Sequence, residues 1–182
     1  MELSKITGKF ISDERELSRK CDDEKFYFYI FQVEDGLDIN VQVSEYITIP
    51  IGVPVAVTGC LSSCKRYSAT KGRKAMFTYF DARLIEPMGE DEAPSKRIEC
   101  SGVVAHIYNL SLTQSGIEKL TIVVKESQGK NRVSIIHYTA LGKRARQIYG
   151  TIHERDRVVG YGVLQKKTES FEVLLSDLEK VE

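Results

Sequence analysis

The residues best suited to chemistry gather around Tyr67. Five cations lie within ten residues of one another in a half of the chain that is otherwise acidic. Lysine and arginine neutralise phosphates, and an aromatic ring can stack on a base, so the combination suits a single strand of nucleic acid. The alternative is a solvated hairpin tip whose charges meet only water. The five cations are Lys65, Arg66, Lys71, Arg73 and Lys74.

A second candidate is the aromatic run Phe26–Phe31, which reads Phe-Tyr-Phe-Tyr-Ile-Phe. In a strand, successive side chains point to opposite faces, so one row must enter a core. The other row is either a stacking platform or an interface with another unit. We expect Tyr27 and Tyr29 to face solvent, because a tyrosine hydroxyl favours a wet environment.

In the second half of the chain, Tyr138 ends an apolar strand pattern. The sequence leaves two roles open for it, a place in the core or an interface, and stacking on a base. Cations precede and follow it, and those on the predicted helix could equally form a solvated face. The cations in question are Lys130, Arg132, Lys143 and Arg144, followed further along by Lys166 and Lys167.

Signals of catalysis and metal binding are weak. The chain has no glycine-rich phosphate loop and neither a Gly-x-Ser-x-Gly nor a His-Glu-x-x-His motif. The cysteine pair Cys60 and Cys64 has a spacing unlike that of a zinc knuckle, and all three histidines lie in the other half. We therefore expect a binding protein without a catalytic site, cofactor or metal.

Length and composition limit the architecture that positions these residues. The chain has 182 residues, enough for two modules of about 90, and 42% hydrophobic with 29% charged residues excludes general disorder. No apolar run is long enough for a membrane span and the N-terminus lacks an apolar leader, so we expect a cytoplasmic protein. Residues 1–95 carry 12 basic and 16 acidic residues, whereas residues 96–182 carry 14 and 10. The second half is thus the more basic one and the better partner for a polyanion.

An acidic stretch with Gly and Pro, residues 88–96, reads as a linker between two domains, residues 1–87 and 97–182. Alternating apolar residues predict five strands on each side, and a helical period appears only over 140–149. The strands expected first are 5–11, 26–31, 37–43, 53–61 and 75–85. Those expected second are 98–107, 120–124, 133–138, 157–164 and 171–175.

The two halves repeat one pattern. Gly8 corresponds to Gly102, and the motif Val-x3-Gly-x-Leu occurs at 55–61 and again at 158–164. The length differences fall in two loops, 44–51 and 62–73, and their counterparts, as expected of a duplicated fold. Five strands with a helix between the third and fourth is the order of an OB-fold, so we predict two tandem OB-fold barrels of all-β class with one short helix. We expect the glycines to lie where the strands bend sharply.

The second half resembles the bacterial and phage single-stranded DNA-binding proteins. The similarity rests on Gly102, Gly116 ahead of a strand, and the segments 134–138 and 155–164, and in the first half on 52–61. Two such units in one chain resemble the duplicated form of this family. The family typically stacks tryptophans on bases and ends in an acidic recruiting tail. This sequence contains no tryptophan and ends at Glu182 directly after a predicted strand, so we expect no recruiting tail.

The resemblance implies sequence-independent binding of single-stranded DNA in replication, repair or mobile-element transfer, with replication proteins as partners. Two alternatives stay open, an OB-fold interaction module and a pair of RNA-binding barrels. The aromatic run 26–31 would leave apolar surface to cover, so we also expect a homodimer that brings four barrels together.

Overall fold

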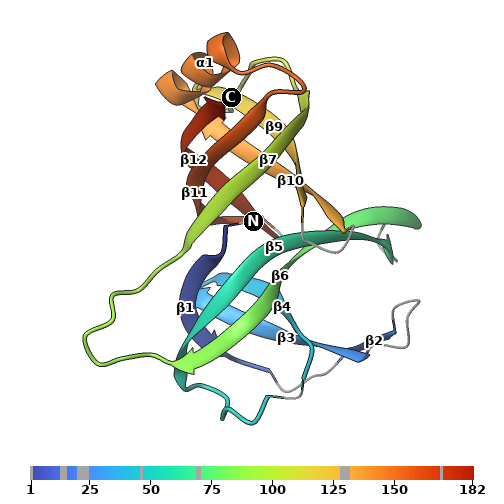
Figure 1. The fold of residues 1–182 in the computed structure, drawn as a ribbon, viewed down its shortest axis with the longest axis vertical. Helices are drawn as coiled ribbons and strands as arrows, with labels where there is room; N and C mark the ends of the chain where they lie inside the picture. The colour runs from blue at the N-terminus through green and yellow to red at the C-terminus, as the bar shows by residue number, and fades with distance from the viewer. Residues whose placement is uncertain are drawn as a thin grey trace.

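The computed structural model describes residues 2–12, 16–19, 25–45, 47–68, 71–127, 132–168 and 170–182. The strands form two separate sheets that lie one above the other along the long axis of the molecule (Figure 1). Each sheet closes on itself, and together they confirm the two tandem OB-fold barrels predicted from the sequence.

The first barrel is ordered β1-β5-β6-β4-β3-β2, and a pairing of β1 with β3 closes it. Its one parallel contact among the described residues joins β4 to β6. The strand β2 is a sixth strand that the sequence pattern did not predict. The elements are β1 (Ser4–Phe10), β2 (Glu16–Arg19), β3 (Lys25–Glu34), β4 (Leu37–Val43), β5 (Pro54–Ser68) and β6 (Arg73–Pro87).

The second barrel has the same topology. Its strands are ordered β10-β12-β11-β7-β9-β8, a pairing of β9 with β10 closes it, and β10 runs parallel to β12. The two-residue strand β8 is again an addition to the expected five. The elements are β7 (Arg97–Ile107), β8 (Ser111–Leu112), β9 (Glu118–Ser127), β10 (Val133–Leu141), α1 (Gly142–Thr151), β11 (Arg157–Lys167) and β12 (Ser170–Val181).

Glycines occupy the same places in both barrels because strands cross there without room for a side chain. A Cβ on Gly8 would lie 2.2 Å from the Gln32 carbonyl oxygen, and one on Gly102 would lie 2.3 Å from that of Lys125. The later pair, Gly59 and Gly162, each follow a register shift in the strand pairing. A bulge bends the strand that carries it, so the expected bends are supported at Gly59 and Gly162. Bends at Gly8 and Gly102 remain a prediction.

The ends of the two barrels are closed differently. In the second barrel, α1 covers the end with its buried residues Ala145 and Ile148. In the first barrel, the segment between β4 and β5 has no helix among its described residues, and Ile47 and Ile49 are partly buried against the core instead. The helix predicted in the second half is confirmed, and the described residues of the first half contain none. No helix in the described part of the chain is long and apolar enough to cross a membrane.

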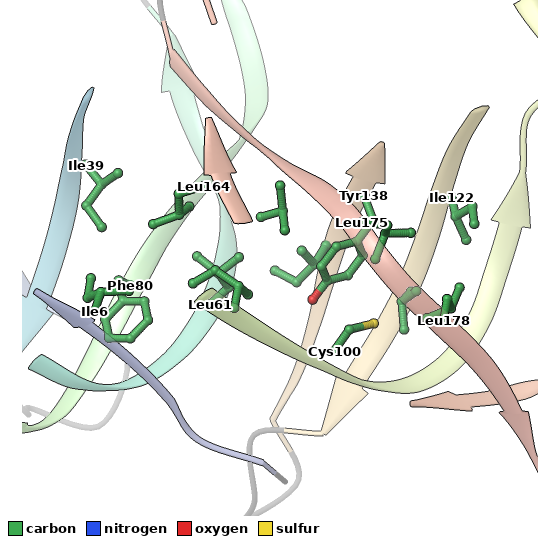
Figure 2. Close-up of a cluster of buried hydrophobic side chains, with 14 of the residues drawn as sticks. Ile6, Ile39, Leu61, Phe80, Cys100, Ile122, Tyr138, Leu164, Leu175 and Leu178 are labelled. Atoms are coloured by element: carbon green, nitrogen blue, oxygen red, sulfur yellow. The ribbon is translucent and has the colours of Figure 1, made fainter. Parts of the chain in front are cut away.

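The two cores meet between the barrels. Figure 2 shows buried side chains running from Ile6 and Phe80 of the first barrel through Leu61 and Leu164 to Tyr138 of the second. Leu61 and Leu164 are the leucines of the repeated Gly-x-Leu motif, so the repeat also supplies apolar contacts near the junction.

Between the barrels, residues 88–95 loop out from β6 before β7 begins (Figure 1). This loop is tied back to β1, because the Thr7 amide donates a hydrogen bond of 2.8 Å to the Ser95 carbonyl and Lys5 forms an ion pair with Glu92. The division into domains 1–87 and 97–182 with a linker at 88–96 remains our proposal.

Candidate nucleic-acid interface

The segment that carries the cations is a long hairpin rather than a loop. Pairing of β5 with β6 continues without interruption to Ser68 opposite Arg73, so the expectation of an irregular loop over 62–73 was wrong. Lys65, Arg66 and Tyr67 lie on β5, and their neighbours Arg73 and Lys74 lie on β6. This segment lacks the alternation of apolar and polar residues that predicts a strand, because neither face of the hairpin tip enters a barrel core.

One face of the hairpin is open to solvent. The register places Lys65 opposite Met76 and Tyr67 opposite Lys74, and side chains at these directly paired positions share a face. All four residues are exposed, and the Tyr67 side chain is 70% exposed. This face therefore presents one aromatic ring between cations, the arrangement that single-stranded nucleic acid requires.

The opposite face of the hairpin packs on β3. The Arg66 guanidinium carbon lies 5.0 Å from the centroid of the Phe28 ring and 4.7 Å from that of Phe77. Phe28 also packs edge-on against Tyr79, with centroids 5.4 Å apart, and Phe77 stacks on Tyr79 at 5.9 Å. These contacts hold the hairpin against the barrel, so the cations on its open face are presented by a fixed support.

Lys71 and Arg73 are exposed near the tip of the hairpin. The hairpin thus brings together Tyr67 and all five cations predicted around it on one projecting element. Figure 1 shows this hairpin extending to the side of the molecule, next to the junction between the two barrels.

The expectation for the aromatic strand was wrong for Tyr29. Its side chain is 5% exposed and packs edge-on against Phe10, with ring centroids 5.6 Å apart. Its hydroxyl has no hydrogen-bond partner among the described residues. Tyr27 is partly buried against the same core. The tyrosine row of β3 faces the inside of the barrel. Burial of the aromatic rings there contributes more free energy than the unpaired hydroxyl of Tyr29 costs.

The other row of this strand is covered as well. Phe26 and Phe28 are buried, and Phe28 packs beneath the β5–β6 hairpin. The strand therefore leaves no wide aromatic surface, which removes the argument for a homodimer based on it.

Tyr138 belongs to the core of the second barrel, so its proposed stacking role was wrong. The side chain is 0% exposed, and its hydroxyl donates a hydrogen bond to the Glu126 carboxylate oxygen Oε1. Burial raises the pKa of Tyr138 and also raises the pKa of Glu126 to about 7. The strand β10 points this ring inward in register with Ile136 and Ala140.

The predicted cations of the second barrel do not form one cluster. Lys143 and Arg144 lie on α1, at the end of the barrel away from the β5–β6 hairpin (Figure 1), and Arg144 bonds Asp177 at 3.1 Å. Lys166 and Lys167 are exposed at the end of β11. Arg132 is exposed at the start of β10, close enough to Tyr79 of the first barrel to affect its pKa. Lys130 lies outside the described residues.

A shallow groove on the second barrel was missed by the sequence reasoning. It is lined by Tyr108, Asn109, Ser111, Thr121 and His137. Tyr108 is 48% exposed and meets the His106 ring edge-on at 4.6 Å. Burial and the positive charge of Lys167 lower the pKa of His137, which favours the neutral form of its ring. The sequence reasoning missed Tyr108 because it lies in a short loop. The available signal was a tyrosine placed directly after a predicted strand.

Among the described residues, no cluster of three or more His, Cys, Asp or Glu could hold a metal ion. Cys60 and Cys100 are buried cysteines, and burial raises the pKa of Cys60 to about 11. The geometry of both barrels thus offers rings, cations and hydrogen-bonding groups on the surface.

Comparison with known proteins supports the fold. No protein-family profile and no curated protein matches the sequence. Two crystal structures of the single-stranded DNA-binding protein from Thermus aquaticus, a deletion mutant and the wild type, match all of this chain with a TM-score of 0.75 each. The identities are 14% and 12%, and the matches cover 95% and 93% of those chains. The resemblance to this family is therefore confirmed at the level of the two-barrel fold.

Proposed function

We propose that this protein binds single-stranded DNA with little sequence preference. The observation that carries the proposal is the β5–β6 hairpin, whose open face presents Tyr67 between Lys65 and Lys74 while its other face is anchored through Arg66. Stacking on an exposed ring is sequence-tolerant because every base has a flat face, and the cations follow the phosphates. The shared fold with a protein described as a single-stranded DNA-binding protein supports the same function.

We further propose that the groove of the second barrel contacts the same strand. Tyr108 offers a ring face, and Asn109 and Ser111 offer polar groups for base edges or sugars. Because the lowered pKa of His137 favours its neutral ring, this side chain suits a hydrogen bond or ring contact better than an ion pair with phosphate. The two barrels would then contribute differently, the hairpin mainly through charge and the groove mainly through neutral contacts.

Replication, repair or transfer of a mobile element are the processes we propose for this activity, with replication proteins as partners. Assembly as a homodimer also remains a prediction. The buried aromatic strand no longer supports it, so it rests on the resemblance to the duplicated family form. Sedimentation at micromolar concentration tests it, and a monomer there would contradict it.

Fluorescence anisotropy with a labelled thymidine oligomer tests the binding proposal. We expect saturable binding that weakens as salt rises, with RNA of the same length and duplex DNA bound less tightly. Equal or tighter binding of the RNA would favour the RNA-binding alternative. If none of the three nucleic acids showed salt-dependent binding, the result would favour the protein-interaction module.

A further inference from the structure

The two barrels are joined by a seam of small polar residues that the sequence pattern did not indicate. The Ser62 and Ser134 hydroxyl oxygens lie 3.0 Å apart, although the residues are 72 positions apart in the chain. The Ser63 amide donates to the Ser134 hydroxyl at 3.2 Å, and the Ile135 amide donates to the Ser63 hydroxyl at 2.8 Å. The edge of β5 thus docks on the edge of β10, and both contributing amides report on whether this seam is closed.

A buried carboxyl lies directly beside the seam. Glu126 of β9 pairs with Ser134 of β10, so both side chains share the inner face of the sheet. Glu126 is 6% exposed. Its carboxylate accepts a hydrogen bond from the Tyr138 hydroxyl, which Figure 2 shows pointing in the direction of Leu61 and Cys100. A charged carboxyl in this position is costly to bury unless its partners compensate for the water it loses.

The titratable groups around Glu126 come from three strands. Tyr138 faces it from β10, Cys100 from β7 and Cys60 from β5 of the other barrel. On β6, Asp81 and Arg83 lie next to Cys60 and form an ion pair at 3.2 Å. Glu126 is near enough to Cys60 for its negative charge to add to the rise in the pKa of that thiol, which burial mainly causes. The Glu126 carboxyl therefore interacts electrostatically with groups of both barrels.

We propose that Glu126 is a proton-controlled latch on the seam between the barrels. With its proton in place, the carboxyl is neutral and the seam stays closed. When the proton leaves, the buried negative charge favours states in which the seam opens and water reaches the carboxylate. The latch is a property of the fold and does not depend on nucleic-acid binding.

The direction of the pH effect follows from linkage. Burial raises the pKa of Glu126 to about 7, although hydrogen bonds from Tyr138, Cys100 and the Ser101 amide act against that rise. In an opened seam the carboxyl returns toward its ordinary pKa of 4.5. The free energy that favours the closed seam is thus greatest below pH 4.5 and falls as the pH rises toward about 7. Above about pH 7 it changes no further.

Hydrogen exchange followed by NMR tests the latch, with rates corrected for the intrinsic pH dependence of exchange. We expect protection of the Ser63 and Ile135 amides to fall by up to about tenfold per pH unit between pH 5 and 7 and to level off at pH 8. The reference amides lie within single barrels, at Ile11, which bonds the Ile30 carbonyl, and at Val104, which bonds that of Asp156. These amides report the opening of a whole barrel, so at each pH their protection should exceed that of the seam amides.

Two variants and a control complete the test. Glu126→Gln removes the titrating proton and should make seam protection independent of pH, whereas Glu179→Gln, an exposed change on β12, should behave as the wild type. Tyr138→Phe removes a hydrogen bond that lowers the pKa of Glu126, so it should move the loosening to higher pH.

The latch is overturned if seam protection in the wild type does not change with pH. It is also overturned if Ser63 and Ile135 exchange only with the free energy of global unfolding measured in urea at the same pH, because the seam would then not open separately from the rest of the protein. An unchanged pH dependence in Glu126→Gln would assign the effect to another group and reject the proposal.

Discussion

Arg66 lies over the ring of Phe77, with 4.7 Å between the guanidinium carbon and the ring centroid, and it also contacts Phe28 of a different strand. A cation in such a position is held by the electron-rich face of the ring. Because β3 belongs to the barrel wall and β6 to the projecting hairpin, this side chain ties the two together. Arg66 therefore serves to position the hairpin, whereas Lys65 and Tyr67 on the opposite face are free to meet a ligand.

The first prediction concerns Arg66→Lys. Lysine keeps the charge but lacks the flat guanidinium that stacks on two rings, so we expect a loss of about 1 kcal/mol in the free energy of unfolding. Urea denaturation measures it. The slope of log affinity against log salt should stay the same because the charge does not change. Arg73→Lys, at an exposed position of the same hairpin, is the matched control and should leave stability unaltered.

The second prediction concerns the charges of the hairpin. Each phosphate neutralised on a single strand contributes about −0.7 to the salt slope, so replacing four exposed cations by Gln should flatten it by up to about 2.8. The anisotropy titration is repeated at several salt concentrations. The four cations are Lys65, Lys71, Arg73 and Lys74.

A single exposed cation of the first barrel, Lys9 on β1, provides the control. Lys9→Gln should change the slope less than Lys65→Gln does. An unchanged slope in the four-residue variant would show that the hairpin is solvated without contacting the strand, and Arg132 and Lys167 would become the leading candidates.

The third prediction concerns Tyr67. Replacement by Ala should weaken binding by about 1–3 kcal/mol while the salt slope stays nearly constant, because stacking releases no counterions. Tyr149→Ala is the matched control, since Tyr149 is exposed on α1 at the far end of the second barrel. If both substitutions weakened binding equally, the effect could not be assigned to stacking at the hairpin.

Much of the fold was predictable because the barrel repeats. The positions of Gly8, Gly102 and the two Gly-x-Leu motifs follow from strands that must cross closely twice, and this requirement leaves a clear pattern in the sequence. The helix was predictable from its apolar spacing. The extension of β5 and β6 past Leu61 was not, since a hairpin outside the core needs no alternation.

The site was predictable in part. The dense group of cations around Tyr67 is visible in the sequence whatever the strand register, so the binding hairpin could be predicted. The orientation of Tyr29 and of Tyr138 depends on which face of a strand enters the barrel, and tyrosine suits either face. The serine seam was hidden because its hydrogen bonds join residues 72 positions apart, and serine is common on any surface.

The fourth prediction concerns the crossing glycines. In Gly102→Ala the new methyl would overlap the Lys125 carbonyl oxygen and a Val124 methyl, so we expect a loss of about 1–3 kcal/mol or more in the free energy of unfolding. Gly8→Ala should behave alike, because the backbone of Gln32 blocks it in the same way. Gly150→Ala is the control, as nothing lies within 4 Å of a Cβ there and the residue is helical; it should gain up to about 1 kcal/mol. Thermal and urea unfolding distinguish the two outcomes, and tolerance of Ala at both crossings would contradict the close approach.

The last prediction concerns the global pH dependence that Glu126 produces. Its pKa is raised from 4.5 to about 7 in the folded protein, chiefly by burial, so the folded state holds a proton that the unfolded state has released between these values. This contribution to the free energy of unfolding is fully present below about pH 4.5 and is lost as pH rises to about 7. One pKa unit corresponds to about 1.4 kcal/mol, so the total change is about 3 kcal/mol. Glu126→Gln lacks the titrating proton, and urea unfolding at pH 5, 6, 7 and 8 should show it gaining on the wild type by about this amount over the range. Because every other titrating group is shared by the two proteins, their difference isolates the carboxyl, and parallel pH profiles would show that Glu126 remains charged when buried.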